Sequence, residues 1–122
     1  MHFIKNFYLP LIWALLSLFA CGVNGKSLPV VSFDIGIDKL AHFLLFGMQA
    51  WLIIFAQYKS RKSITWPMLH WAVALSIVYG IILEGMQATV FINRSYDYAD
   101  MLANAAGALL CYPLAFYRFR LK

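Results

Sequence analysis

Four long apolar stretches, separated by short polar segments, dominate the pattern along the chain. Each is close to the roughly 20 residues that an α-helix needs to cross the hydrocarbon core of a bilayer. We place the helices at about residues 7–23, 38–58, 67–87 and 97–117. Gly25, Pro29 and Gly36 mark a loop before the second helix, and Pro67 begins the third, where a missing N–H costs nothing. The pattern predicts an all-α membrane protein, a bundle of four transmembrane helices.

The composition also favours the bilayer over water as the solvent. Of the 122 residues, 63% are hydrophobic and 12% are charged, whereas soluble domains carry about 25% charged residues. So short a chain cannot bury this much apolar surface, and we expect one domain over residues 1–122. The net charge of +5 does not indicate a nucleic-acid partner, because the basic residues lie in short clusters beside apolar stretches. We expect membrane lipids as partners and leave the oligomeric state open.

Basic and acidic residues are divided unequally between the two sides of the predicted bundle. The side with both termini holds seven basic residues: Lys5, Lys59, Arg61, Lys62, Arg118, Arg120 and Lys122. The other side holds three, namely Lys26, Lys39 and Arg94. Basic residues mark cytoplasmic loops, so both termini are predicted to be cytoplasmic. All five acidic residues fall on the opposite, outer side: Asp34, Asp38, Glu84, Asp97 and Asp100.

Helical spacing predicts which of the outer polar residues share a helix face. Asp38 and His42 are four residues apart and share one face of the second helix. Asp97, Asp100 and Asn104 form one stripe on the fourth helix, directed into the bundle. A neighbouring stripe of small residues, which lets helices approach closely, consists of Ala99, Ala103 and Gly107. Asp38 and Asp97 stand at predicted helix N-termini, where capping alone would account for an acid.

Capping does not account for Glu84, which lies near the C-terminal end of the third helix, where the helix dipole disfavours an acid. Ionisable groups inside a membrane are functional candidates. We expect Arg94 to be its partner, either in a ligand site or in a purely structural pair that holds the loop between the last two helices. Lys39 is expected to extend toward the lipid headgroups. The candidate ligand residues are therefore Asp38, Lys39, His42, Glu84, Gln87, Arg94, Asp97, Asp100 and Asn104.

The two cysteines, Cys21 and Cys111, are expected to remain unpaired, because the predicted topology places them at different depths. The residues Leu18-Phe19-Ala20-Cys21 resemble a lipoprotein signal with a modified cysteine, which leaves open an alternative in which the first helix is cleaved. Phe19 is bulky where such signals carry small residues, so we retain the helix.

At these polar positions the chain resembles the VanZ-like family of bacterial membrane proteins. The resemblance covers about residues 38–107 and rests on Asp38-Lys39 with His42-Phe43, Glu84 with Gln87, Arg94 with Asp97 and Asp100, and Asn104 with Gly107. Asn93 stands where the family often has a glycine. The resemblance implies a multi-pass protein of the bacterial inner membrane. It also implies a place in the cell envelope and a link to resistance to teicoplanin, a glycopeptide antibiotic that acts on cell-wall precursors.

Three functional hypotheses follow from these residues and this resemblance. In the first, the outer polar residues bind an envelope lipid headgroup, a glycolipid or a cell-wall precursor, with Arg94 and Lys39 as anion contacts. In the second, the protein is an intramembrane enzyme that acts on a lipid-linked substrate, with His42 or Glu84 as general base and Asp100 orienting it. In the third, the cluster only holds the helices together.

We favour a role without catalysis, because no nucleophile is evident, and we assign no catalytic residue. We also expect no cofactor and no metal, since one histidine makes a poor metal site. Were the enzyme hypothesis to use a divalent ion, its ligands would be Asp38, His42, Glu84 and Asp100.

Overall fold

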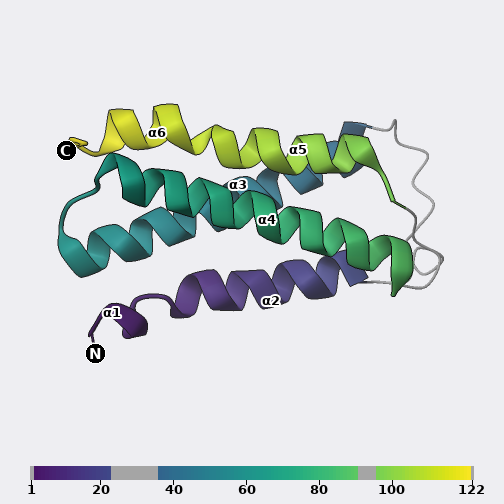
Figure 1. Cartoon of the computed structure of the whole chain (residues 1–122), viewed down its shortest axis with the longest axis horizontal. Coiled ribbons are helices and arrows are strands. Elements are labelled where there is room, and N and C mark those ends of the chain that lie inside the picture. Colours follow the sequence, from purple (N-terminus) through teal and green to yellow (C-terminus); the bar gives the residue numbers. More distant parts are fainter. Residues whose placement is uncertain (1, 23–35, 91–95, 122) are drawn as a thin grey trace.

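The described part of the chain is entirely helical. The computed structural model describes residues 2–22, 36–90 and 96–121, and no strand occurs within them. The helices are α1 (His2–Lys5), α2 (Tyr8–Gly22), α3 (Gly36–Arg61), α4 (Trp66–Thr89), α5 (Tyr98–Leu109) and α6 (Cys111–Arg118). They lie alongside one another as an elongated bundle, with α1 and the end of α6 at the same end (Figure 1). The predicted all-α fold class is confirmed.

Three of the helical segments are long and apolar enough to cross a membrane, namely Asp38–Arg61, Trp66–Thr89 and Tyr98–Arg118. The first predicted span corresponds to α2, which has 15 residues and is shorter than the roughly 20 that a straight span requires. Membrane character is thus supported by three helices, and a fourth span remains a prediction.

The last predicted helix, residues 97–117, is divided in the structure into α5 and α6, which meet at Leu110. Pro113 explains the division, because it has no N–H to donate to the carbonyl of Leu109 and its ring crowds that carbonyl. Leu110 nevertheless keeps helical dihedral angles, φ −59° and ψ −22°. The two segments therefore continue in nearly the same direction and together form one span-length element (Figure 1).

The helices α3 and α5 approach each other closely. A Cβ atom built on Gly107 would lie 2.0 Å from the carbonyl oxygen of Phe43, and one built on Gly47 would lie 3.0 Å from the oxygen of Gly107. The backbones thus touch where both helices have glycine. The predicted stripe of small residues is only partly used for this contact, because Ala99 at its outer end is exposed.

Polar side chains on α2 and α4 bond to backbone carbonyls of neighbouring helices. The Trp13 indole Nε1–H donates to the carbonyl of Leu45 at 2.8 Å, and the Ser76 hydroxyl donates to that of Phe46 at 2.7 Å. Such interhelical hydrogen bonds stabilise helix pairs in lipid, where no hydrophobic effect drives them together. The two cysteines, Cys21 on α2 and Cys111 on α6, are buried and form no disulfide bond with each other, as predicted.

Candidate functional site

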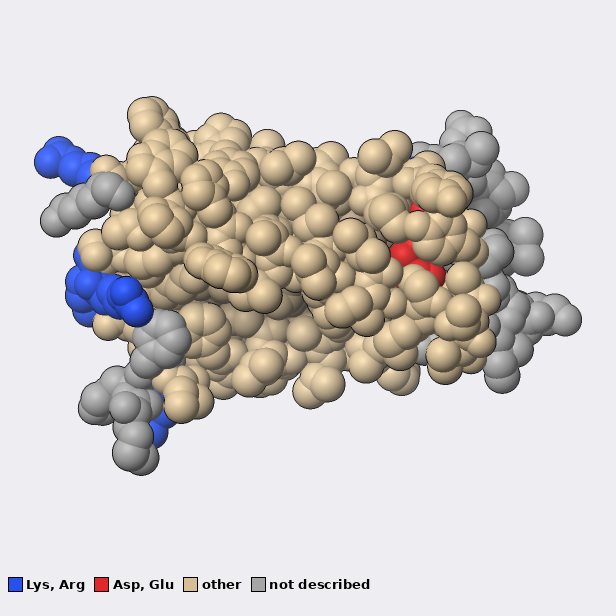
Figure 2. Space-filling model, in the orientation of Figure 1, with Lys and Arg blue, Asp and Glu red and all other residues tan. Residues whose placement is uncertain are grey.

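Opposite charges gather at the two ends of the bundle. Lysine and arginine side chains lie at the end with α1 and the end of α6, and acidic side chains are visible near the opposite end (Figure 2). At this acidic end α3 begins, α4 ends and α5 begins (Figure 1). Six of the nine predicted ligand residues come together there. We call them the polar cluster: Asp38, Lys39, His42, Asp97, Asp100 and Asn104.

Lys39 connects three carboxylates of the polar cluster. Its Nζ lies 2.6 Å from Asp97 Oδ2 and 3.5 Å from Asp38 Oδ2, and it also contacts Asp100 Oδ1. The side chain is 22% exposed. The expectation that Lys39 extends toward lipid headgroups is wrong, because the carboxylates on α5 offer stronger, charge-assisted hydrogen bonds.

Asp97 caps α5, as its position in the sequence predicts. Its Oδ1 accepts the backbone N–H of Ala99 at 2.8 Å, while its Oδ2 accepts from Lys39. The Lys39 ammonium first, and then the Ala99 N–H, hold the pKa of the Asp97 carboxyl below its usual value. Of the two roles considered for Asp38, a helix cap or a member of the outer polar group, the structure shows its contacts with that group. α3 begins at Gly36, so Asp38 lies inside the first turn and contacts Lys39 and His42.

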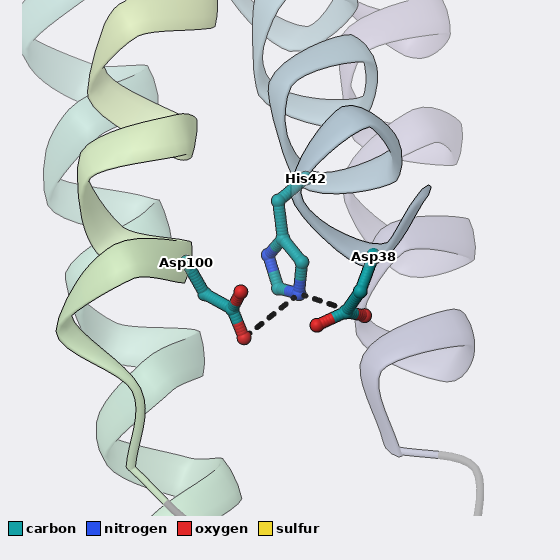
Figure 3. Close-up of side chains that lie close together, drawn as sticks. All are labelled: Asp38, His42 and Asp100. Atoms are coloured by element: carbon teal, nitrogen blue, oxygen red, sulfur yellow. Dashed lines mark ion pairs between the residues drawn. The ribbon is translucent and has the colours of Figure 1, made fainter. Parts of the chain in front are cut away.

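His42 lies at the centre of the polar cluster and is 6% exposed. Its Nδ1 is 2.9 Å from Oδ1 of Asn104, and with the amide in this orientation Nδ1 is the donor, because an amide oxygen only accepts. The other nitrogen, Nε2, lies 3.5 Å from Asp100 Oδ2 and 4.0 Å from Asp38 Oδ1 (Figure 3). One edge of the ring therefore faces the Asn104 amide, and the other faces the carboxylates of Asp38 and Asp100.

Glu84 and Gln87 hold α4 against its neighbours and are not part of the polar cluster. Glu84 is 1% exposed, and its Oε1 accepts the backbone N–H of Asp97 at 2.9 Å. The Gln87 amide donates to the carbonyl of Cys21 on α2 at 3.1 Å. The end of one antiparallel helix meets the beginning of the next, so the positive N-terminus of α5 compensates an acid at the C-terminal end of α4.

That interhelical contact is not visible in helix periodicity, and sequence reasoning therefore missed the Glu84 partner on α5. Arg94, the predicted partner of Glu84, lies outside the described residues, so the Glu84–Arg94 pair stays a prediction. Asp34 also lies outside the described residues.

An apolar groove is formed partly by the helices that carry the polar cluster, and sequence reasoning did not identify it. It has a volume of about 610 Å³ and runs along α3, α5 and α6, with Trp13 of α2 on its border. Ala41 and Phe43, which flank His42 in the chain, line the groove together with Gly107 and Leu110. The glycines of α3 and α5 were a usable signal, because small side chains leave room beside a helix contact.

The family described as VanZ/LLP1 matches residues 1–120 of the 122. This protein belongs to the VanZ/LLP1 family. The match extends the resemblance from residues 38–107 to nearly the whole chain, so the first helix is part of the family pattern too. No curated protein and no solved structure matched the chain.

Proposed function

We propose that this VanZ/LLP1 family protein binds an envelope lipid in the bacterial inner membrane. The headgroup would lie against the polar cluster and the hydrocarbon chain in the apolar groove. In this proposal α2 is a fourth, short span and both termini are cytoplasmic, which agrees with the basic residues at the end of the bundle that carries α1 and the end of α6. The polar cluster then faces the outer side of the membrane, where cell-wall precursors are found.

The observation that carries the proposal is the state of Lys39. Its ammonium group is already paired with three carboxylates, so it is a poor contact for an anionic ligand, contrary to our expectation from the sequence. Two of the carboxylate side chains remain open, since Asp38 is 54% and Asp97 44% exposed. A surface of open carboxylates accepts hydrogen bonds, which favours a headgroup rich in donors, such as sugar hydroxyls or an ammonium group.

The apolar groove supports a lipid over a water-soluble ligand. It is lined by residues on either side of His42 in the chain, so the polar cluster and the groove share α3 and α5. Its border is open to the membrane, because Leu44 and Leu114 are 58% and 47% exposed. A molecule with a polar head and a long chain fits both features at once, as ligand sites commonly combine an apolar lining with a few polar groups.

The proposal is tested by mass spectrometry of lipids that co-purify with the protein. Asp38→Asn and Asp97→Asn each remove a carboxylate and should each reduce the bound glycolipid or amine-containing lipid severalfold. Lys59→Gln removes a charge at the opposite end of the bundle and should leave the lipid unchanged. If the bound lipids are the same in all four proteins, the polar cluster does not bind a headgroup.

The link to teicoplanin resistance that the family resemblance implies belongs to the same proposal. A protein that holds a cell-wall precursor at the outer surface would change how much antibiotic target is accessible. Bacteria that express the wild type should show a raised inhibitory concentration of teicoplanin, and Asp38→Asn at equal protein level should not. Equal resistance with both proteins would separate the phenotype from the polar cluster.

A further inference from the structure

The orientation of His42 is set by one hydrogen bond, and the bond leaves the other ring nitrogen facing two acids. Nδ1 lies 2.9 Å from Asn104 Oδ1 and, with the amide in this orientation, donates its proton to that oxygen. The ring is 7% exposed at its side chain, and Figure 3 shows Nε2 directed between the carboxylates of Asp38 and Asp100. A neutral ring with its proton on Nδ1 has a lone pair on Nε2. In that state the lone pair would face the carboxylates of Asp38 and Asp100, an arrangement that is repulsive unless a cation lies between them.

A proton alone fills this place poorly. The Nε2–oxygen distances of 3.5 and 4.0 Å exceed the roughly 2.7–3.2 Å of an N–H···O hydrogen bond. One ligand atom from each of Asp38, His42 and Asp100 can be chosen so that all three lie within 4.8 Å of one another. Ligands bound to zinc at about 2.0–2.2 Å in a tetrahedron lie roughly 3.4 Å apart. Small side-chain movements would therefore close the three atoms around an ion.

Lys39 does not compete for the atoms that such an ion would use. The ammonium group contacts Asp38 Oδ2 and Asp100 Oδ1, whereas the oxygens that face His42 are Asp38 Oδ1 and Asp100 Oδ2. Each carboxylate thus uses one oxygen for Lys39 and turns the other toward the histidine. Lysine and the Asn104 amide then hold the three side chains in place from outside, as groups around bound metals commonly do.

We propose that Asp38, His42 and Asp100 bind a divalent metal ion of the zinc type. An imidazole nitrogen with two carboxylates favours zinc or manganese over magnesium or calcium, which prefer oxygen alone. Three protein ligands leave a position open for water or a ligand group. From the sequence we expected no metal, because only one histidine was available, and we counted Glu84 among the four weak ligand candidates. The structure uses Glu84 elsewhere and provides Asn104 to orient the ring.

The test is zinc binding by the full chain, purified in detergent and stripped with a chelator, measured by equilibrium dialysis with elemental analysis. Wild type should bind about one zinc ion per chain, and Asp38→Asn and His42→Asn should weaken binding by at least about tenfold. Asp38 is an exposed residue, so its replacement leaves the fold intact. Asp97→Asn is the matched control, because it removes a charge that is also largely exposed and that contacts Lys39 but not His42, and it should bind zinc normally.

Zinc should also raise the unfolding temperature of the wild type and of Asp97→Asn but not that of Asp38→Asn, because a ligand stabilises only the state that binds it. Absence of zinc binding by the wild type would overturn the proposal. Equal weakening by Asp97→Asn and Asp38→Asn would also overturn it, since the ion would then respond only to net charge. The assay contains no envelope lipid, and the lipid proposal requires Asp97 whereas the metal proposal does not, so each can fail separately.

Discussion

Replacing Gly107 with alanine should disrupt the bundle more than its single added methyl group suggests. The new Cβ would lie 2.0 Å from the carbonyl oxygen of Phe43 and 3.1 Å from the backbone nitrogen of Gly47. Both neighbours are backbone atoms, which cannot rotate away, so α5 must move from α3 by at least about 1 Å. Overpacking of this kind typically costs about 1–3 kcal/mol. The change should therefore lower the free energy of unfolding by about that amount.

Gly85→Ala is the matched control, because a Cβ built there meets no heavy atom within 4 Å. It adds the same methyl group to a helix and should leave stability unchanged or raise it by up to about 1 kcal/mol through helix propensity. Titration with SDS in mixed micelles, followed by the fluorescence of the four tryptophans, measures both variants.

The same replacement should also damage the polar cluster. Phe43 follows His42 directly, so moving α5 carries Asp100 and Asn104 away from the histidine, and zinc affinity should fall together with stability. If Gly107→Ala proves as stable as Gly85→Ala, the backbone contact between α3 and α5 is not what sets the distance between these helices, and the reasoning is refuted.

Three further predictions follow from contacts at helix ends and between helices. Glu84→Ala leaves the backbone N–H of Asp97 without its acceptor and should cost about 1–3 kcal/mol, whereas Glu84→Gln keeps an acceptor oxygen and should cost less in the same SDS titration. A carboxyl whose pKa is lowered in the folded state contributes stability above its unfolded pKa and loses it as pH falls through the folded pKa. Since Lys39 lowers the pKa of Asp97, wild type should lose more stability than Asp97→Asn on acidification; parallel pH profiles would contradict this. Trp13→Phe removes the hydrogen bond to Leu45 and should weaken the docking of α2 by roughly 0.6 kcal/mol, seen as faster proteolysis near the N-terminus, and unchanged cleavage would count against it.

Helix positions could be predicted closely from hydropathy. The prediction of 67–87 corresponds to Trp66–Thr89, and 38–58 corresponds to Gly36–Arg61. In lipid each backbone N–H and C=O must be bonded within its own helix, so apolar length alone specifies a helix without knowledge of its neighbours. The N-cap formed by Asp97 could also be predicted, because it depends only on residues next to it in the chain. The division at Leu110 also has a local cause, since Pro113 can be read from the sequence. It was not predicted, because the length of an apolar stretch does not show whether the helix is interrupted within it.

The sequence by itself therefore determined the helices, the placement of the acids on one side and the residues that share a helix face, because all three depend on the chain's own spacing. Only the tertiary structure decided the partners. Lys39 contacts three carboxylates instead of lipid headgroups, Glu84 accepts the backbone N–H of Asp97, and the His42 ring is held by Asn104. Such pairs depend on how far apart two helices lie and how each is rotated, and here the contact at Gly107 and Gly47 determines how closely α3 and α5 approach.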